Sequence, residues 1–377
     1  MEKRTFQQTQ DAVSLLGFGC MRLPKLQGGG QEIDYDRALE MVDYAYRHGV
    51  NYFDTAYGYH DGMSETFIGE ALKRYPRDSF NLATKLPTWL IQSEADVLRY
   101  LQEQLTKCQV DHFDYYLVHG LTASRFSTVK QHNVFNALKK CQAEGLVGRI
   151  GFSFHDKPAV LADILTVYDW EFAQIQLNYI DWDLQDAKQQ YELIVQKGIQ
   201  CTIMEPVRGG ALAVLSPEAV EVFKKAAPDA SVASWAIRYA ASLPGVLTVL
   251  SGMSTLDQVV DNVATMTPFV PLNDQDYALV QTALAAFHKA VTVPCTACRY
   301  CMDCKSGVDI PTVLSAYNNY AISQNRLQFM RYYEDIQESA RAHNCTACGV
   351  CKEACPQQID IPTLMKTIAE VGSRQPS

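Results

Sequence analysis

The chain of 377 residues has neither long apolar runs nor clusters of basic charge. No apolar stretch approaches the roughly 20 residues that a membrane-spanning helix needs. The N-terminal segment MEKRTFQQTQDAV also lacks the apolar core of a signal peptide. Lys and Arg are scattered and the formal net charge is −9, which argues against nucleic acid and against an anionic membrane surface as partners. We therefore expect a cytoplasmic protein.

Cysteine is sparse before residue 290 and dense after it. The early cysteines are Cys20, Cys108, Cys141 and Cys201. We interpret these four as small, buried apolar residues. The other eight follow residue 290, and because cytoplasmic thiols stay reduced, they indicate metal or redox chemistry before disulfides.

Short apolar runs alternate with longer amphipathic segments over most of the chain. The runs expected to form strands are residues 15–19, 50–53, 80–84, 113–118, 147–152, 173–178, 200–204 and 246–250. Eight strand–helix units predict a (β/α)8 barrel. An open dinucleotide-binding sheet would require a G-x-G-x-x-G motif after a strand, and the sequence has no such motif. The sequence thus predicts an α/β fold, with a TIM barrel over residues 1–288 and a small, mainly α-helical ferredoxin-like domain over residues 289–377.

Two cysteine runs near the C-terminus repeat each other and end in GVDIPT and QIDIPT. The first run is Cys295, Cys298, Cys301 and Cys304, and the second is Cys345, Cys348, Cys351 and Cys355. The second run, followed by Pro356, has the bacterial ferredoxin spacing for a [4Fe–4S] cluster. We predict two [4Fe–4S] clusters, with helices at residues 311–322 and 326–342 between the runs.

In two-cluster ferredoxins the fourth cysteine of each run binds the other cluster. By that rule one cluster takes Cys355 with the first three cysteines of the first run, and the other takes Cys304 with the first three of the second run. The first run is one residue shorter and has Lys305 in place of the proline, so ligation without exchange stays open. Two zinc sites are the alternative, although zinc more often pairs two C-x2-C units across a longer gap.

Functional residues of a barrel lie at the C-terminal ends of its strands. This rule selects Asp54, Lys85 and His119, and the stretch FDTAYGYHDGMSE adds Tyr59. The Lys85 ammonium is expected to favour the Tyr59 phenolate and lower the pKa of that tyrosine. Asp54 would hold Lys85, and His119 would form a hydrogen bond to a substrate carbonyl. The set suits general acid catalysis on an oxygen whose carbon receives a hydride.

The set resembles the motif of the aldo/keto reductase family, in which an Asp is followed by a Tyr five residues later, a Lys and a His. The whole chain resembles the branch of that family with a C-terminal ferredoxin-type domain. The resemblance implies a barrel that binds NAD(P)H and reduces aldehydes or ketones, or runs the reverse reaction. It also implies that Ser153 and Gln174 hold the nicotinamide, with Gln176 as the alternative to Gln174. Phe154 stands where the family has an asparagine.

Two further segments resemble the family's nucleotide-binding loops. MEPVRGGAL, residues 204–212, resembles the pyrophosphate loop, and SGMSTLDQVVDN, residues 251–262, resembles the adenosine segment. The implied contacts are Met204, Pro206, Val207, Arg208, Gly209, Gly252, Met253, Gln258 and Asn262. Members that prefer NADPH place Lys and Arg where this chain has Gly252 and Gln258, so the resemblance favours NADH.

Hydride transfer moves two electrons together, whereas a [4Fe–4S] cluster moves one. Flavin is therefore a third cofactor to consider, although no sequence feature demands it. We expect an NAD(P)-linked carbonyl oxidoreductase whose clusters exchange electrons with a redox protein partner or with the substrate. In one alternative the clusters only stabilise the C-terminal region or dock a partner. In the other, the chain is an electron-transfer or redox-sensing protein whose barrel no longer transfers hydride.

Overall fold

The computed structural model describes residues 1–7, 11–26, 30–287, 293–323 and 326–373. They form two compact units, of which the first comprises Met1–Val207 and Ala233–Asp274 and the second comprises Arg208–Val232 and Gln275–Ser377. The domain boundary that we predict after residue 288 lies outside the described residues. Within the described ranges, every helix is too short or too polar to cross a membrane.

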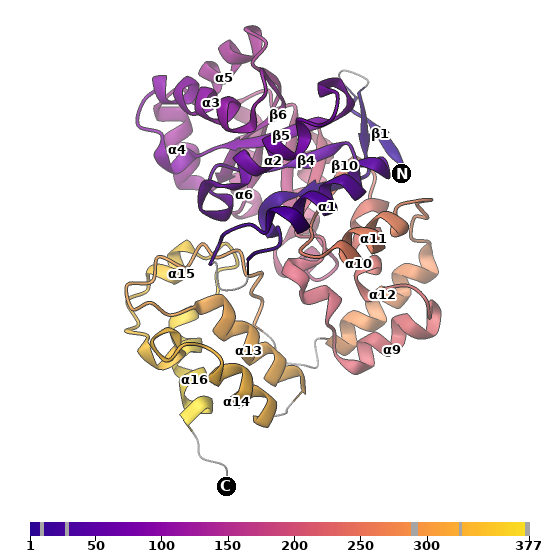
Figure 1. Ribbon diagram of the computed structural model, residues 1–377, viewed down its shortest axis with the longest axis vertical. Helices are drawn as coiled ribbons and strands as arrows, with labels where there is room; N and C mark the ends of the chain where they lie inside the picture. The colour runs from indigo at the N-terminus through magenta and orange to yellow at the C-terminus, as the bar shows by residue number, and fades with distance from the viewer. Residues whose placement is uncertain (8–10, 27–29, 288–292, 324–325, 374–377) are drawn as a thin grey trace. The chain divides into compact units, whose positions relative to one another are not determined.

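A closed barrel of eight parallel strands forms the centre of the first unit, in the order β10-β3-β4-β5-β6-β7-β8-β9 (Figure 1). The strands are β3 Leu16–Gly19, β4 Tyr52–Asp54, β5 Asn81–Leu86, β6 Phe113–Leu121, β7 Val147–Phe154, β8 Phe172–Gln176, β9 Gln200–Met204 and β10 Val246–Gly252. Both faces of a closed parallel sheet are buried, which is why its strands are nearly continuous apolar runs. Each strand overlaps a run predicted from the sequence, so the predicted barrel is confirmed.

Helices connect successive strands of the first unit. They are α1 Tyr35–Arg47, α2 Ser64–Leu72, α3 Ala95–Cys108, α4 Ala123–Gln131, α5 Val134–Ala143, α6 Pro158–Val167, α7 Asp181–Leu184, α8 Ala187–Gln196, α10 Val232–Ser242 and α11 Leu256–Thr265. Side-chain caps start several of them, for example Thr122, whose hydroxyl accepts from the Arg125 N–H at the start of α4. Gly49 follows α1 with a φ of 92°, the left-handed conformation that ends helices.

An N-terminal hairpin, which we did not predict, precedes the barrel. Its strands β1 Lys3–Thr5 and β2 Ala12–Ser14 have only three residues each, too few for a periodic signal. Phe6 is buried with its ring edge-on to Tyr115, at a centroid distance of 5.7 Å. The same apolar cluster includes Tyr52 and Phe172, the first residues of β4 and β8. The hairpin therefore packs at the N-terminal ends of the strands and leaves their C-terminal ends, here called the barrel mouth, for the site.

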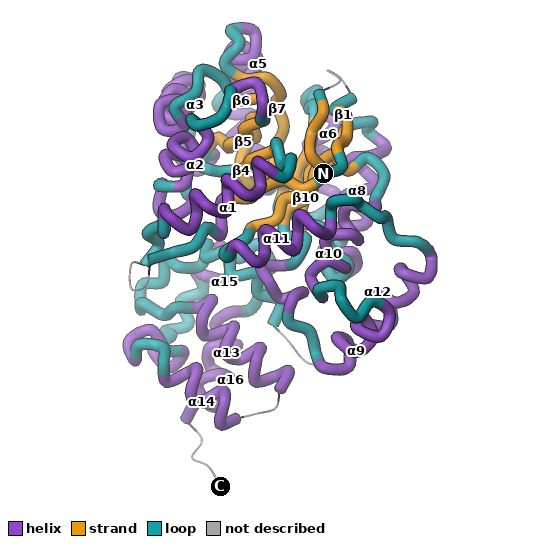
Figure 2. The backbone as a smooth tube through the Cα atoms, turned by 45° about the vertical axis from the view of Figure 1, so that its right-hand side comes forward, coloured by secondary structure: helices purple, strands orange, loops and turns teal. Residues whose placement is uncertain are grey.

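The second unit is helical where it is described, and residues 293–323 and 326–373 contain helices and turns but no strand (Figure 2). Its helices are α9 Pro217–Ala226, α12 Asp274–Phe287, α13 Ile310–Ser323, α14 Arg326–Glu334, α15 Val350–Ala354 and α16 Ile361–Ser373. The expected helix over residues 326–342 is wrong beyond Glu334. There the Arg341 guanidinium donates to the carbonyl oxygens of Glu334 and Ile336, at 2.7 and 2.9 Å, and so binds carbonyls that a continuing helix would use.

Candidate functional site

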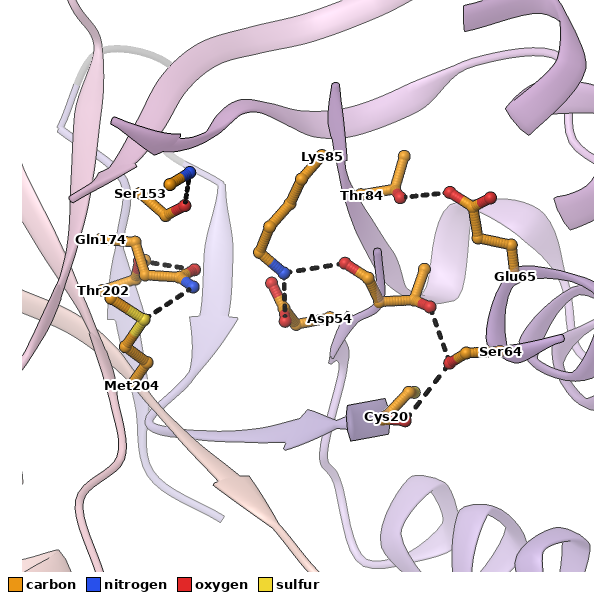
Figure 3. A network of polar contacts seen from close by, with 12 residues as sticks. Cys20, Asp54, Ser64, Glu65, Thr84, Lys85, Ser153, Gln174, Thr202 and Met204 are labelled. Atoms are coloured by element: carbon orange, nitrogen blue, oxygen red, sulfur yellow. Dashed lines mark hydrogen bonds and ion pairs between the residues drawn. The ribbon is translucent and has the colours of Figure 1, made fainter. Parts of the chain in front are cut away.

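A buried ion pair lies at the barrel mouth. Asp54 ends β4 and Lys85 lies near the end of the adjacent strand β5. Lys85 Nζ donates to Asp54 Oδ1 at 2.6 Å and to the Thr55 carbonyl oxygen at 2.8 Å (Figure 3). Lys85 is only 1% exposed and Asp54 only 4%. Because both charges are removed from water, each depends on the other for its stability.

The other two predicted catalytic residues lie beside this pair. Tyr59 begins a short turn after β4, and Lys85 Nζ is 5.0 Å from the centre of its ring. His119 lies on β6, and its ring centroid is 6.1 Å from that of Tyr59, with the two planes at 83°. The structure thus gathers Asp54, Tyr59, Lys85 and His119 at the barrel mouth.

The pKa of Tyr59 is raised well above its ordinary value, opposite to the direction that we predicted. Burial is the main cause, and the nearby carboxylates of Asp54 and Glu205 raise it further, while Arg22 lowers it. The Lys85 ammonium does not reverse this shift because Asp54, at 2.6 Å, compensates part of its charge. Tyr59 therefore remains a neutral phenol at neutral pH.

His119 is also neutral. Burial lowers its pKa well below the ordinary value, and the charges of Lys85, Arg125 and His155 lower it further. Its Nδ1 atom is buried and has no hydrogen-bond partner among the described residues. A neutral imidazole donates through one nitrogen and accepts through the other. His119 therefore retains capacity for a hydrogen bond with a bound oxygen.

The candidate nicotinamide residues lie on two neighbouring strands, β7 and β8. Ser153 on β7 is paired in register with Gln174 on β8, and the Ser153 hydroxyl accepts from the Gly120 N–H at 2.7 Å. The Gln174 amide accepts from Thr202 at 3.4 Å, and its Nε2 is 3.7 Å from Met204 Sδ (Figure 3). By contrast, the Gln176 amide donates to Asp181 at 2.7 Å. The geometry places Gln174, rather than Gln176, with Ser153.

The remaining candidate nucleotide contacts divide between the two units. In the first unit, Pro206 and Val207 follow β9, and Gly252 and Met253 lie at the end of β10. Asn262 in α11 donates to the Ser251 hydroxyl at 2.9 Å, and the Gln258 side chain accepts from the Ser254 N–H at 2.8 Å. In the second unit, Arg208 is buried and Gly209 has a left-handed φ of 65°.

Sequence reasoning missed a polar network that lies behind Lys85. Glu65 in α2 is fully buried, and its Oε1 accepts from Thr84 at 2.7 Å (Figure 3) and from Gln104 at 2.5 Å. The Gln104 amide also donates to the Lys85 carbonyl oxygen at 3.0 Å. Burial raises the pKa of Glu65. A charged residue on the same helix face as Ile68 and Leu72 was the available signal.

In the second unit each of two cavities is lined by cysteines from both runs. Cys295, Cys298, Cys301 and Cys355 line the first cysteine cavity, and Cys304, Cys345, Cys348 and Cys351 line the second cysteine cavity. The apolar lining follows the sequence repeat, with Leu314, Ile359 and Ile361 in the first cavity and Met365, Val308 and Ile310 in the second. The two runs are therefore interleaved, with the fourth cysteine of each lying in the other's cavity.

The backbone of the two runs has the same conformation just after the first cysteine. Ala297 and Ala347 occupy equivalent positions with left-handed φ angles of 52° and 56°. Each of their amides lies 3.4 Å from the sulfur two residues before it, on Cys295 or Cys345. Amides directed at sulfur are a means by which proteins stabilise and tune iron–sulfur ligands.

The donor set fits iron–sulfur clusters. Burial raises the pKa of Cys301 to about 12, and the thiols of Cys298, Cys295 and Cys355 contribute. Burial likewise raises the pKa of Cys351, with contributions from Cys345, Cys304 and Cys348. Thiols crowded in an apolar cavity do not ionise together unless cations compensate them, as bound iron does. Among the described residues, no three His, Cys, Asp or Glu side chains form a group that could hold a single metal ion.

Comparison with known proteins bears on both parts of the chain. The model of the aldo/keto reductase family matches residues 15–285, and that of the 4Fe-4S dicluster domain matches residues 294–359. L-galactose dehydrogenase of Arabidopsis thaliana is 27% identical over 301 residues, which are 73% of this chain and 92% of that protein. The NADH-specific methylglyoxal reductase of Escherichia coli is 22% identical over 339 residues, which are 77% of this chain and 100% of that protein.

A solved structure agrees with these matches. The holo form of the aldo-keto reductase AKR11C1 from Bacillus halodurans superposes with a TM-score of 0.62 at 25% identity, and the superposition covers 75% of this chain and 96% of that one. The family model spans most of the chain, and the site residues lie where the barrel strands end. The protein therefore belongs to the aldo/keto reductase family, and its reductase domain is followed by a 4Fe-4S dicluster ferredoxin domain.

Proposed function

We propose that this protein is an NAD(P)H-dependent reductase of aldehydes or ketones in which Tyr59 donates the proton. The observation that carries the proposal is the Asp54–Lys85 pair beside the rings of Tyr59 and His119. Neutral His119 would donate a hydrogen bond to the substrate carbonyl oxygen and hold it against the Tyr59 hydroxyl. Reduced nicotinamide, when bound, supplies the hydride.

The raised pKa of Tyr59 is compatible with this role. A carbonyl oxygen becomes alkoxide-like as its carbon receives hydride, and an alkoxide is a far stronger base than a phenolate. Tyr59 can therefore protonate it even though its pKa is high. The Lys85 ammonium, 5.0 Å from the ring centre, then stabilises the phenolate that the transfer leaves behind.

These protonation states predict a broad plateau in the pH profile of carbonyl reduction. Reduction requires Tyr59 protonated and His119 neutral. The pKa of Tyr59 lies above the ordinary 10.0 and that of His119 lies below the ordinary 6.5. We therefore expect kcat/KM to be constant between about pH 6.5 and about pH 10. It should fall only at a pH above this range, where Tyr59 loses its proton, or below it, where His119 gains one. Steady-state rates from pH 5.5 to 10.5 measure this, and a fall near pH 8 would contradict it.

For the nucleotide, we propose that Ser153 and Gln174 hold the carboxamide and that residues 251–262 hold the adenosine end. Arg208 and Gly209 would contact the pyrophosphate. Gly252 and Gln258 bring no positive charge to a 2′-phosphate, which favours NADH. The E. coli relative, which is named as NADH-specific, supports this preference.

An anaerobic titration tests the proposed function. Purified protein is mixed with NADH or NADPH and a panel of aldehydes and ketones, and nucleotide oxidation and cluster absorbance are followed together. We expect oxidation that depends on the carbonyl compound and is faster with NADH. Bleaching of the clusters by NADH alone would favour electron exchange with a redox partner and would call for a flavin search. No oxidation with any carbonyl compound would favour an electron-transfer or redox-sensing protein.

For the second unit, we propose two [4Fe–4S] clusters, each bound by three cysteines of one run and the fourth of the other. This rests on the interleaved cysteine cavities and on the matching backbone of the two runs. The clusters would exchange single electrons with a redox protein partner or with the substrate. Eight thiol ligands suit a reducing compartment such as the cytoplasm.

Paired substitutions distinguish exchanged from unexchanged ligation. In the double variant Cys295→Ser/Cys355→Ser both changes fall in the first cysteine cavity, so we expect one intact cluster and about half the iron. In Cys345→Ser/Cys355→Ser the changes fall in different cavities, so we expect both clusters to be damaged. Iron content and EPR of the dithionite-reduced protein measure this, with Cys201→Ser in the barrel as the control. The reverse pattern would establish unexchanged ligation.

A further inference from the structure

Trp89 connects the reacting residues to a nearby arginine at the barrel mouth. It lies in the turn after β5 and is 46% exposed. Its ring is 5.2 Å from that of His119, and a methyl group at Gly58, next to Tyr59, would lie 3.8 Å from its edge. On the same ring, the guanidinium carbon of Arg125 is 5.6 Å from the centroid. The indole thus borders both the site of the carbonyl group and a cation.

The Arg125 side chain is held in place beside His119. Its Nη1 donates to the carbonyl oxygen of Gly120, the residue after His119, at 2.9 Å. Gly120 has a φ of +61°, and a Cβ there would lie 2.5 Å from the same Nη1. The guanidinium therefore packs directly on the Gly120 backbone, and a larger residue there would displace it from this position. Because the guanidinium of Arg125 is already held in one position, it loses less conformational entropy when it binds an anion.

The charge of Arg125 changes the pKa values of two neighbouring histidines. It lowers the pKa of His119 and also that of His155, which burial and the two cations Arg125 and Lys85 bring to about 4. Both histidines are neutral at neutral pH, and Asp54 compensates Lys85 at 2.6 Å. Arg125 therefore places a positive charge beside these two histidines.

We propose that Arg125, with Trp89 as its wall, forms a subsite for an anionic group of the substrate, a carboxylate or a phosphate. The inference rests on the proposed carbonyl reduction and narrows its substrate class to carbonyl compounds that carry such a group a few bonds from the carbonyl. The guanidinium fork matches the two oxygens of either anion. The chain between the two groups of the substrate lies along the exposed indole face.

Pairs of probes that differ only in charge test the subsite. The first pair is 4-oxobutanoate and its methyl ester, and the second is glyceraldehyde 3-phosphate and glyceraldehyde. We expect wild-type protein to have a higher kcat/KM for the charged member of at least one pair, and the preferred pair identifies the anion. Arg125→Gln should reduce that value about 10- to 100-fold and leave the neutral member within about twofold. Arg125→Lys should retain part of the preference.

A matched control is Lys130→Gln, which removes an exposed cation from the same helix and should change neither probe. Equal losses for both members of a pair in Arg125→Gln would overturn the proposal, because a purely structural brace affects all substrates alike. A wild-type protein without preference for either charged probe would also overturn it. If no carbonyl compound is reduced, the proposed function fails. Calorimetric binding of 4-oxobutanoate and inorganic phosphate to wild type and Arg125→Gln then decides the subsite separately.

Discussion

Replacement of Tyr59 by phenylalanine is expected to lower kcat for carbonyl reduction by about 10²- to 10⁴-fold, the usual contribution of a positioned general acid. The substitution removes one hydroxyl and keeps the ring that lies beside Lys85 and His119. Nucleotide affinity should therefore stay unchanged, as should the iron content. Steady-state rates and fluorescence titration with NADH measure the two quantities.

Tyr57→Phe is the matched control, because this tyrosine lies two residues earlier and packs against Lys107, whose Nζ is 4.1 Å from its ring centre. It should retain wild-type kcat. If Tyr59→Phe also keeps wild-type kcat, the proton comes from another group and the proposed mechanism is wrong.

Lys85→Met is expected to affect both stability and activity. It leaves the Asp54 carboxylate buried without its cation, which costs about 3–5 kcal/mol of unfolding free energy in comparable buried pairs. Burial already raises the pKa of Asp54, and Lys85 is the group that lowers it. Without Lys85 the pKa of Asp54 should rise further, and because the protonated carboxyl carries no buried charge, the loss of stability should shrink as the pH falls. The four tryptophans lie at residues 89, 170, 182 and 235, so urea unfolding followed by their fluorescence reports on the barrel.

A second substitution separates the two effects. The double variant Lys85→Met/Asp54→Leu has no buried charge at this position and should recover much of the lost stability while it stays inactive. Lys107→Met is the control, since the side chains of its pair with Glu103 at 2.6 Å are 26% and 37% exposed and solvent-screened, so that its loss should cost at most about 1 kcal/mol. If Lys85→Met unfolds like wild type, the ion pair does not stabilise the barrel.

Much of the barrel could be predicted because its signals are local. Each strand is a short apolar run, and the strand-end rule alone selected Asp54, Lys85 and His119. The N-terminal hairpin could not be predicted because its strands are only three residues long. Its packing also depends on a contact between Phe6 and Tyr115, which lie more than a hundred residues apart in the sequence. The end of α14 could not be predicted either, because it depends on hydrogen bonds from Arg341, a residue beyond the helix.

Electrostatics could not be predicted in the same way. The sequence suggested that Lys85 would lower the pKa of Tyr59, but the direction depends on burial and on Asp54 and Glu205, which only the fold brings near. The Glu65 network is likewise built from residues on α2, β5 and α3. The sequence also left open which of the two clusters Cys355 binds, and the fold brings this residue to the first cysteine cavity.

The interleaving of the cysteine runs constrains how the protein matures during synthesis. The first cysteine cavity needs Cys355, and the second needs Cys304 together with the second run. Translation adds about 5–20 residues per second and delivers the first run well before the second. The second cavity has all its cysteines only after Cys351 has been made, and the first only after Cys355. Iron delivery must therefore follow synthesis of both runs, whereas the barrel strands are all available earlier.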